Sequence, residues 1–350
     1  MAYGFAGRAL VGALAAVMMA VPFSFSAKAQ GEVNVYSYRQ PFLIEPLLDA
    51  FTKETGIETN VIFAGKGLVE RMVAEGANSP ADVLLTVDIG RLRGAVDKDV
   101  SQPVQSAVLE KNIPAKYRGK NDEWFGLTLR SRVVYASKER VDQDSITYEE
   151  LADPKWRGRI CIRDGQHPYN VALFASIIAH HGEDAAKEWL AGLKENLARK
   201  PSGNDRAQVK AIYAGECDIG IGNTYYMGKM LTNEKEPEQK EWAKSVKILF
   251  PNADGRGSHV NVSGMVMAKH APNPENAKKL MEFLSSEKAQ QLYAQLNYEY
   301  PVKPGVEVSD LVASWGELNP DDLTLTEIAE LRKRASELVD EVGFNEGPSS

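Results

Sequence analysis

The sequence is poor in the two side chains that hold most transition metals in proteins. Its 350 residues include five His and two Cys, against 13 Tyr. Zinc and copper(I) sites depend on imidazole or thiolate ligands, so a site of that kind would be poorly supplied here. Composition alone therefore argues against a metal protein built on His or Cys.

Familiar enzyme signatures are also missing. The sequence contains no GxSxG nucleophile elbow, no GxxxxGK(S/T) phosphate loop, no HExxH helix and no CxxC pair. Asp and Glu are plentiful but scattered, and no nucleophile-and-base set stands out. We therefore do not expect an enzyme, and an exported hydrolase is the weakest of the functional classes considered.

Positive charge is in deficit. The chain has 41 Lys and Arg against 48 Asp and Glu, for a net charge of −7. A general nucleic-acid binder needs a basic face, so no nucleic-acid partner is expected. The hydrophobic fraction of 43% and the charged fraction of 25% are typical of a folded soluble protein. The length favours two domains or one large bilobal unit.

Only the beginning of the chain carries a long apolar run. Residues 1–29 contain no Asp or Glu, and the apolar run 9–25 is followed by Ala27-Lys28-Ala29. This pattern predicts a signal peptide cleaved after Ala29. The alternative is an uncleaved membrane anchor, but the run is short for a bilayer span. No second run of spanning length follows, so we expect a soluble, exported mature protein.

Two successive series of alternating strand and helix patterns follow. The first has strands at 33–38, 58–64 and 82–87 with helices from Pro41 and over 68–75, which predicts a parallel α/β sheet. A long strand is expected at 125–137. The second series has strands at 159–164 and 217–221, and helices at 170–181, 184–197 and 205–214. Further strands are expected at 246–250 and 259–268, a long helix at 274–296 and a last helix at about 325–342. Residues 345–350 are expected to be loose.

The two series predict two lobes with a cleft between them. The strand-like runs near Phe125 and near Asn261 are candidate crossovers from one lobe to the other. Two such crossings would form a hinge. Ligands of α/β proteins bind at domain interfaces near the carboxyl ends of strands, so the cleft is the expected binding site.

Tyrosines stand where such a cleft would be lined. Tyr225 and Tyr226 follow the strand 217–221 in the motif Asn-Thr-Tyr-Tyr, and Tyr169 stands in a matching turn after the strand 159–164. Neighbouring strands would bring the three phenols together. They could equally line an apolar cleft or stack on an organic ligand, and the pattern leaves both alternatives open.

Three phenolates would suit a ferric ion. Hard oxygen ligands favour hard, highly charged cations, and a phenol with a pKa of about 10 ionises near neutrality only when a strong Lewis acid replaces its proton. Three phenolates neutralise Fe(III) and leave positions for an anion. Arg130 and Arg132, two apart on a strand, share a face and could hold that anion. Alternatively, they are surface or hinge-lining charges.

The two cysteines are candidates for a disulfide. Cys161 and Cys217 each lie in a strand-like piece, and an exported protein meets an oxidising compartment. A bond would close a long loop and stabilise the fold by about 3–4 kcal/mol in the chain-entropy model. The alternative is two separate buried thiols.

The mature chain resembles bacterial periplasmic ferric-ion-binding proteins, the solute receptors of iron(III) ABC transporters. The most specific carrier is Gly222-Asn-Thr-Tyr-Tyr226. The others are Val35-Tyr-Ser-Tyr-Arg-Gln40, Pro80-Ala-Asp-Val-Leu-Leu-Thr86, Leu129-Arg-Ser-Arg-Val-Val-Tyr135, Asp164-Gly-Gln-His-Pro-Tyr169, Asn273-Pro-Glu-Asn-Ala277 and Phe283-Leu-Ser-Ser286. The resemblance implies an α/β, bilobal Venus-flytrap receptor of type II with a two-strand hinge. It places residues 30–128 and about 260–306 in the N-terminal lobe, and about 129–259 and 307–350 in the C-terminal lobe.

The resemblance also implies the site. Tyr225 and Tyr226 match iron ligands of the family, and Tyr169 matches a third ligand of one subgroup. Where other subgroups place a ligand His or Tyr, this chain has Gln40 and Pro41, and where some use a carboxylate it has Val87, followed by Asp88. A three-tyrosine site makes a synergistic anion such as carbonate or bicarbonate expected. Its anchor would be Arg130 or Arg132, with Asn204 and Asn223 as further donors around the site.

The implied function is periplasmic capture of Fe(III) and its delivery to the inner-membrane permease of an ABC transporter. We expect a soluble monomer that works by coordination and hinge motion. The alternative is a receptor of the same fold for an organic cation or oxyanion, such as a polyamine, thiamine or sulfate.

Overall fold

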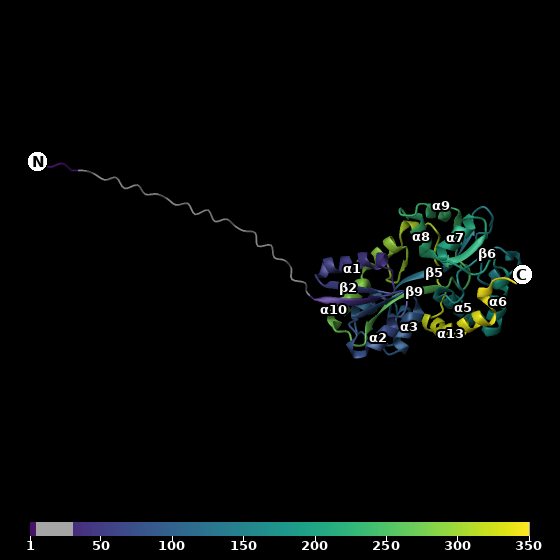
Figure 1. Cartoon of the computed structure of the whole chain (residues 1–350), viewed down its shortest axis with the longest axis horizontal. Helices are drawn as coiled ribbons and strands as arrows, with labels where there is room; N and C mark the ends of the chain where they lie inside the picture. The colour runs from purple at the N-terminus through teal and green to yellow at the C-terminus, as the bar shows by residue number, and fades with distance from the viewer. Residues whose placement is uncertain (5–30, 350) are drawn as a thin grey trace.

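A computed structural model of the chain describes residues 1–4 and 31–349. The predicted signal peptide, apart from its first four residues, and its cleavage site lie outside the described residues. Within the described part of the chain, no helix is both long enough and apolar enough to cross a membrane. The described strands form one ten-stranded mixed sheet with helices on both sides (Figure 1).

The sheet begins as the parallel α/β unit that the sequence predicts. β1 (Glu32–Ser37) pairs in parallel with β2 (Glu58–Phe63) and β3 (Val83–Thr86). The order then continues through β9 (Val260–Ala268), β5 (Phe125–Ser137), β7 (Ile219–Asn223) and β6 (Ile160–Cys161). Three short strands lie off this path: β4 (Ser101–Gln102), β8 (Val246–Leu249) and β10 (Tyr300–Pro301).

The strand β5 passes from one half of the sheet to the other. Its first part, from Phe125 to Ser131, pairs with β9, and its second part, from Arg132 to Ala136, pairs with β7. All 13 residues of β5 are buried, which fits a strand covered on both faces. The predicted crossover near Phe125 is therefore present, and β9 runs beside it as the second central strand (Figure 1).

The helices are grouped in two lobes, one at each end of this sheet (Figure 1). The first lobe carries α1 (Pro41–Thr55), α2 (Leu68–Glu75), α3 (Ile89–Asp97), α4 (Ala107–Asn112), α10 (Pro274–Leu284) and α11 (Glu287–Leu292). The second carries α5 (Pro168–His181), α6 (Glu183–Glu195), α7 (Asp205–Tyr213), α8 (Thr224–Leu231) and α9 (Glu238–Lys244). Two further helices, α12 (Asp310–Ala313) and α13 (Leu325–Glu341), follow in the chain.

Local sequence explains where two of these helices begin and end. Pro41 occupies the first position of α1, where its missing N–H costs nothing, and Gly56 ends the helix in the left-handed conformation. A capping box opens α13: Thr324 accepts from the backbone of Glu327, and the Glu327 carboxylate accepts from Thr324 in return. The last helix starts at the predicted residue, Leu325.

Helix α13 contacts both lobes. It packs mainly against α5 of the second lobe and also against α3 of the first. The predicted boundary, which assigns residues from about 307 onward to the C-terminal lobe, remains a prediction. Helix α13 packs against helices of both lobes.

Two predictions in the last quarter of the chain are wrong. The helix expected over residues 274–296 is interrupted, because Ser286 leaves helical geometry and caps α11 by accepting from the backbone of Ala289. A π-helical turn (Tyr293–Asn297) follows. Residues 345–350 are predicted to be loose, but the Asn345 side chain bonds to Asp164 and to the backbone of Gly165, and the Ser349 hydroxyl donates to Glu195 at 2.8 Å. Residue 350 lies outside the described residues.

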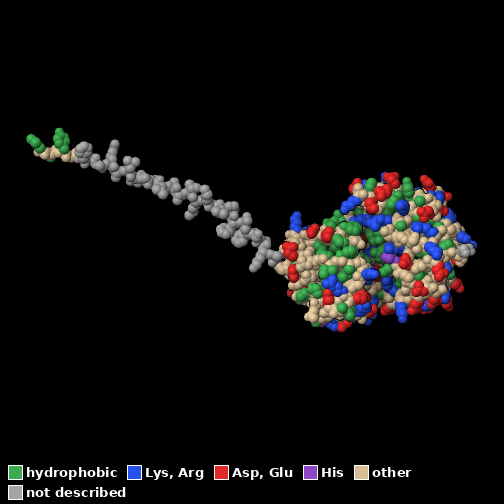
Figure 2. Space-filling view, viewed as in Figure 1, with side chains coloured by type: hydrophobic (Ala, Val, Ile, Leu, Met, Phe, Trp, Pro, Cys, Tyr) green, Lys and Arg blue, Asp and Glu red, His purple; other side chains and the backbone are tan. Residues whose placement is uncertain are grey.

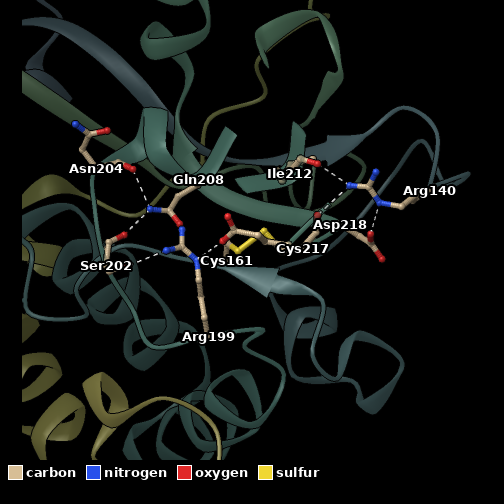
Figure 3. Close-up of a disulfide and its surroundings, with 10 residues drawn as sticks. Arg140, Cys161, Arg199, Ser202, Asn204, Gln208, Ile212, Cys217 and Asp218 are labelled. Carbon is tan, nitrogen blue, oxygen red and sulfur yellow. Dashed lines mark hydrogen bonds and ion pairs between the residues drawn. A yellow bond between two sulfur atoms is a disulfide. The ribbon is translucent and has the colours of Figure 1, made fainter. Parts of the chain in front are cut away.

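The predicted disulfide is confirmed. Cys161, at the end of β6, is bonded to Cys217, two residues before β7, with the Cα atoms 5.9 Å apart (Figure 3). The strand expected at 217–221 begins only at Ile219, because Cys217 belongs to the turn that the disulfide holds. Next to this turn, Asp218 pairs with Arg140 and Arg159.

Candidate functional site

A cleft of about 210 Å³ lies between the two lobes. Side chains from the starts of several helices line it, together with residues from the central strand. They are Tyr38, Arg39, Gln40, Leu43, Gly65, Val87, Asp88, Arg91, Arg130, His167, Pro168, Tyr169, Tyr225, Tyr226 and Glu299. On the face that Figure 2 shows, Lys and Arg side chains gather where the lobes meet, while Asp and Glu are spread over the outer surface.

The paired tyrosines stand in the first turn of α8. Asn223 ends β7 and precedes this helix, so Tyr225 and Tyr226 follow directly at the carboxyl end of a central strand. Their rings stack with centroids 4.2 Å apart and planes inclined by 29°. This arrangement places both phenols at the cleft, as the sequence predicts.

Burial makes the phenols of Tyr225 and Tyr226 harder to ionise. It raises the pKa of Tyr225 well above its usual value, and the neighbouring Tyr169 and Tyr226 raise it further, while Arg130 opposes the shift. Burial also raises the pKa of Tyr226 to about 12, with Asp205 adding to the effect. Only a strong Lewis acid would displace these protons near neutral pH.

The third tyrosine stands at the start of another helix. Pro168 opens α5, and the backbone N–H of Tyr169 donates to Nδ1 of His167 at 3.2 Å. Three guanidinium carbons surround the Tyr169 ring: those of Arg130 and Arg163 lie 5.5 Å from its centroid, and that of Arg132 lies 6.0 Å away. The structure therefore brings Tyr169, Tyr225 and Tyr226 into one cleft beside positive charge.

Histidine is available only in neutral form. His167 lines the cleft, but burial lowers the pKa of its imidazole to about 3, and Arg163 and Arg132 lower it further. Its Nδ1 already accepts from the backbone. Among the residues described in this structure, no three His, Cys, Asp or Glu side chains come together as a metal site.

Arg132 is fully engaged inside the second lobe. Its Nη1 lies 2.7 Å from Asp205 Oδ2 and 3.1 Å from Asn223 Oδ1, and its Nη2 donates to Asn170 Oδ1 at 2.7 Å. Arg163 also pairs with Asp205, at 3.0 Å. Arg132 does not line the cleft.

Arg130 has free hydrogen-bonding capacity. It is 1% exposed, like Arg132, yet its Nε and Nη2 have no partner. Its Nη1 contacts the Ser263 hydroxyl and lies 3.8 Å from Glu299. A buried guanidinium with unpaired N–H groups at a cleft wall is suited to receive an anion.

The two asparagines predicted near the anion, Asn204 and Asn223, differ in burial. Asn223 is buried beside Arg132, and its Nδ2 has no partner. Asn204 is exposed and caps α7, where its Oδ1 accepts from the backbone of Ala207 at 3.1 Å. Figure 3 shows Asn204 beside Gln208, which donates to the Asn204 carbonyl. The structure does not bring Asn204 to the cleft.

Residues 78–316 match a family described as bacterial extracellular solute-binding protein. The chain belongs to this family. It is 47% identical to iron uptake protein A1 of Synechocystis, over 92% of this chain and 90% of the relative. Among solved structures it resembles the apo ferric ion-binding protein A of Pasteurella haemolytica, with a TM-score of 0.85 and 56% identity over 90% of this chain and 98% of the other.

A Trichodesmium protein solved in complex with iron and citrate is also similar, with a TM-score of 0.85 and 42% identity over 90% of this chain and all of the other. These structures confirm the predicted bilobal fold of a periplasmic solute-binding protein. Relatives of this solute-binding protein are transport proteins rather than enzymes.

The cleft of this solute-binding protein also holds residues that the sequence patterns did not single out. Arg39 is buried and pairs with Glu299 at 3.0 Å, and Glu299 in turn accepts from the Thr128 hydroxyl. The guanidinium of Arg91 lies 4.1 Å from the centroid of the Tyr38 ring. Arg39 could have been suspected, since it follows Tyr38 at a strand end, but no local pattern indicates Glu299.

Proposed function

We propose that this solute-binding protein binds Fe(III) through the phenolates of Tyr169, Tyr225 and Tyr226. The observation that carries the proposal is the convergence of these three phenols, from the starts of α5 and α8, in one cleft. The similarity to iron uptake and ferric ion-binding proteins supports it. Ferric iron is the transported solute, and three phenolates would neutralise its charge.

The donor set fits this ion better than a softer one. Phenolate is a hard oxygen ligand, and the cleft lining offers no thiol and a single imidazole, that of His167, whose Nδ1 accepts from the backbone of Tyr169. Of the two cleft carboxylates, Glu299 pairs with Arg39, and Asp88 lies 3.5 Å from Arg91 and 3.6 Å from Arg332, with no hydrogen bond to its Oδ2. Both carboxylates face guanidinium groups, which repel a cation, whereas three tyrosine oxygens are available together.

An anion would complete the coordination. Three phenolates leave positions open on an octahedral ion, and the unpaired Nε and Nη2 of Arg130 supply donors for an anion bound there. Carbonate or bicarbonate would fit this role. A polycarboxylate is a further candidate, because the Trichodesmium relative was solved with iron and citrate.

The transport role follows from the fold and the predicted signal peptide. We propose that the exported monomer captures Fe(III) in the periplasm and delivers it to an inner-membrane ABC permease. Binding requires coordination and movement of the lobes about the central strands, without covalent chemistry. Catalysis forms no part of this proposal.

The test is addition of ferric citrate to the purified apoprotein, followed by visible spectroscopy and elemental analysis. We expect one iron per chain and a red colour from charge transfer between phenolate and iron. A protein that stays colourless and gains no iron would contradict the proposal.

An oxyanion receptor is the second candidate. It is favoured over an organic-cation receptor because Arg39, Arg91 and Arg130 all line the cleft. In that case the tyrosines would donate hydrogen bonds as neutral phenols. Elemental analysis of the protein as purified separates the candidates, since an oxyanion receptor would lack stoichiometric iron.

A further inference from the structure

A side chain of the last helix reaches across the cleft. Arg332 of α13 donates from Nη1 to the carbonyl oxygen of Pro168 at 3.0 Å, and its Nη2 lies 3.6 Å from Oδ1 of Asp88. Pro168 belongs to the second lobe and Asp88 to the first, and both line the cleft. The Arg332 side chain is 18% exposed, so this bridge is largely shielded from water.

A glycine makes room for this bridge. A Cβ added at Gly90, in the first turn of α3, would lie 2.4 Å from Nε and 2.6 Å from Cζ of Arg332. The backbone of Gly90 does not have a positive φ, so its conformation does not require glycine. Glycine disfavours a helix by about 1 kcal/mol relative to alanine. Close packing of the Arg332 guanidinium on α3 therefore explains why this position has no side chain.

The bridge joins two helix starts that carry cleft residues. Pro168 is followed directly by Tyr169, and Asp88 caps α3 by accepting from the backbone of Arg91 at 3.2 Å. The positive ends of two helix dipoles repel the Arg332 guanidinium, and the buried Asp88 carboxylate offsets this repulsion. The contact therefore depends on the starts of α3 and α5 lying side by side.

We propose that Arg332 is a positioning residue that clasps the two lobes across the cleft and slows the release of iron. Helix α13 packs mainly against α5, which Pro168 opens, so movement of α5 away from α3 would keep the bond of Arg332 to Pro168 and break its contacts with Asp88 and Gly90. Those contacts fix the start of α5, and with it Tyr169, relative to the first lobe. The part that concerns iron rests on the proposed function, whereas the clasp between the lobes does not.

The experiment compares Arg332→Gln, Arg332→Lys and Gly90→Ala with a matched control, Gly94→Ala. Gly94 lies one turn further along α3 and has open space where its Cβ would be. Each protein is loaded with ferric iron, and the loss of the visible band is followed after addition of a chelator. We expect release about tenfold faster in Arg332→Gln and Gly90→Ala, because each loses a charged contact. Arg332→Lys should fall between them and the wild type, and Gly94→Ala should match the wild type.

Small-angle scattering of the metal-free proteins forms the second arm. We expect a larger radius of gyration in Arg332→Gln and Gly90→Ala than in the wild type and Gly94→Ala. If the wild type binds no iron, the proposed function fails, and the scattering alone decides on the clasp. Equal release rates and equal radii in all variants would overturn the proposal, and so would equal acceleration in Gly94→Ala.

Discussion

Two arginines on one strand have different surroundings, and we expect them to have different roles. Arg130 and Arg132 lie two apart on β5, and each is 1% exposed. Arg132 is surrounded by Asp205, Asn170 and Asn223, and its guanidinium is fully bonded. Arg130 lines the cleft and keeps two nitrogens without partners.

This difference distinguishes the residues around Arg132, which stabilise the fold, from those around Arg130, which we expect to bind the ligand. A buried charge without full hydrogen bonding costs free energy, so such a group is retained where a ligand completes its bonds. The Arg132 guanidinium needs no ligand, and its partners Asn223, Asn170 and Asp205 lie at the end of β7 and at the starts of α5 and α7. Around Arg130, by contrast, two guanidinium nitrogens lack hydrogen-bond partners, and the pKa values of Tyr225 and Tyr226 are raised. A bound anion would accept hydrogen bonds from Arg130, and a bound ferric ion would replace the phenol protons.

The largest expected effect is on iron binding by Tyr225→Phe. The substitution removes one direct ligand, and partners that only orient a ligand already cost about 10–100-fold in metal affinity. We therefore expect a loss of more than about 100-fold and of most of the visible band, measured by ferric titration. Tyr213→Phe is the matched control, because Tyr213 is 54% exposed and lies outside the cleft. An unchanged spectrum in Tyr225→Phe would remove Tyr225 from the site.

Next in size is the effect of Arg132→Met on stability. Breaking a buried ion pair costs about 3–5 kcal/mol, and the low end applies here because Arg163 still pairs with Asp205. Denaturant unfolding of the metal-free protein should show a loss of about 3 kcal/mol, and Arg130→Met should lose clearly less. Equal losses in the two variants would erase the distinction between the two regions.

Arg130→Gln should weaken the binding of the anion, and through it the binding of iron, instead of the fold. We expect iron affinity to fall about tenfold, the effect of losing one charged hydrogen bond, when the anion is carbonate. The measurement is ferric titration with and without added bicarbonate: the wild type should bind more tightly with bicarbonate, and the variant should respond less. A variant with the full bicarbonate response would show that Arg130 does not hold the anion.

The smallest expected effect concerns acid stability. Burial by itself would raise the pKa of Asp205, but Arg132 and Arg163 outweigh it and hold the pKa lower than usual. A lowered pKa in the folded state stabilises the fold above the unfolded pKa, about 3.9, and this contribution is lost as the pH falls through the folded value. Unfolding of metal-free Asp205→Asn should therefore depend less on pH below about 4 than unfolding of the wild type. Identical pH slopes would contradict this role.

Sequence patterns predicted the elements whose signals are local. The strand 125–137, the helix over 68–75 and the start of α13 match the structure, because strand-like runs, apolar spacing and caps are properties of neighbouring residues. The break at Ser286 could not be foreseen, since the apolar pattern of the helix continues past it and only the cap interrupts it. The tyrosines were found because Tyr225 and Tyr226 closely follow β7 and Tyr169 stands at the start of α5, the helix after β6.

Contacts between distant segments could not be predicted in this way. The sequence treated Arg130 and Arg132 as equivalent, because the residues that distinguish them, Asp205 and Glu299, are 73 or more positions away. For the same reason Asn204 was expected near the anion, although it caps a helix. The contact of Arg332 with Gly90 joins residues far apart in the chain, and no local pattern indicates it.

A crystal structure of the iron-loaded protein tests the central claim most directly. We predict one iron bound by the phenol oxygens of Tyr169, Tyr225 and Tyr226, with an exogenous anion against Nε or Nη2 of Arg130. An iron bound elsewhere, or a cleft that holds an oxyanion hydrogen-bonded to neutral phenols, would contradict the account.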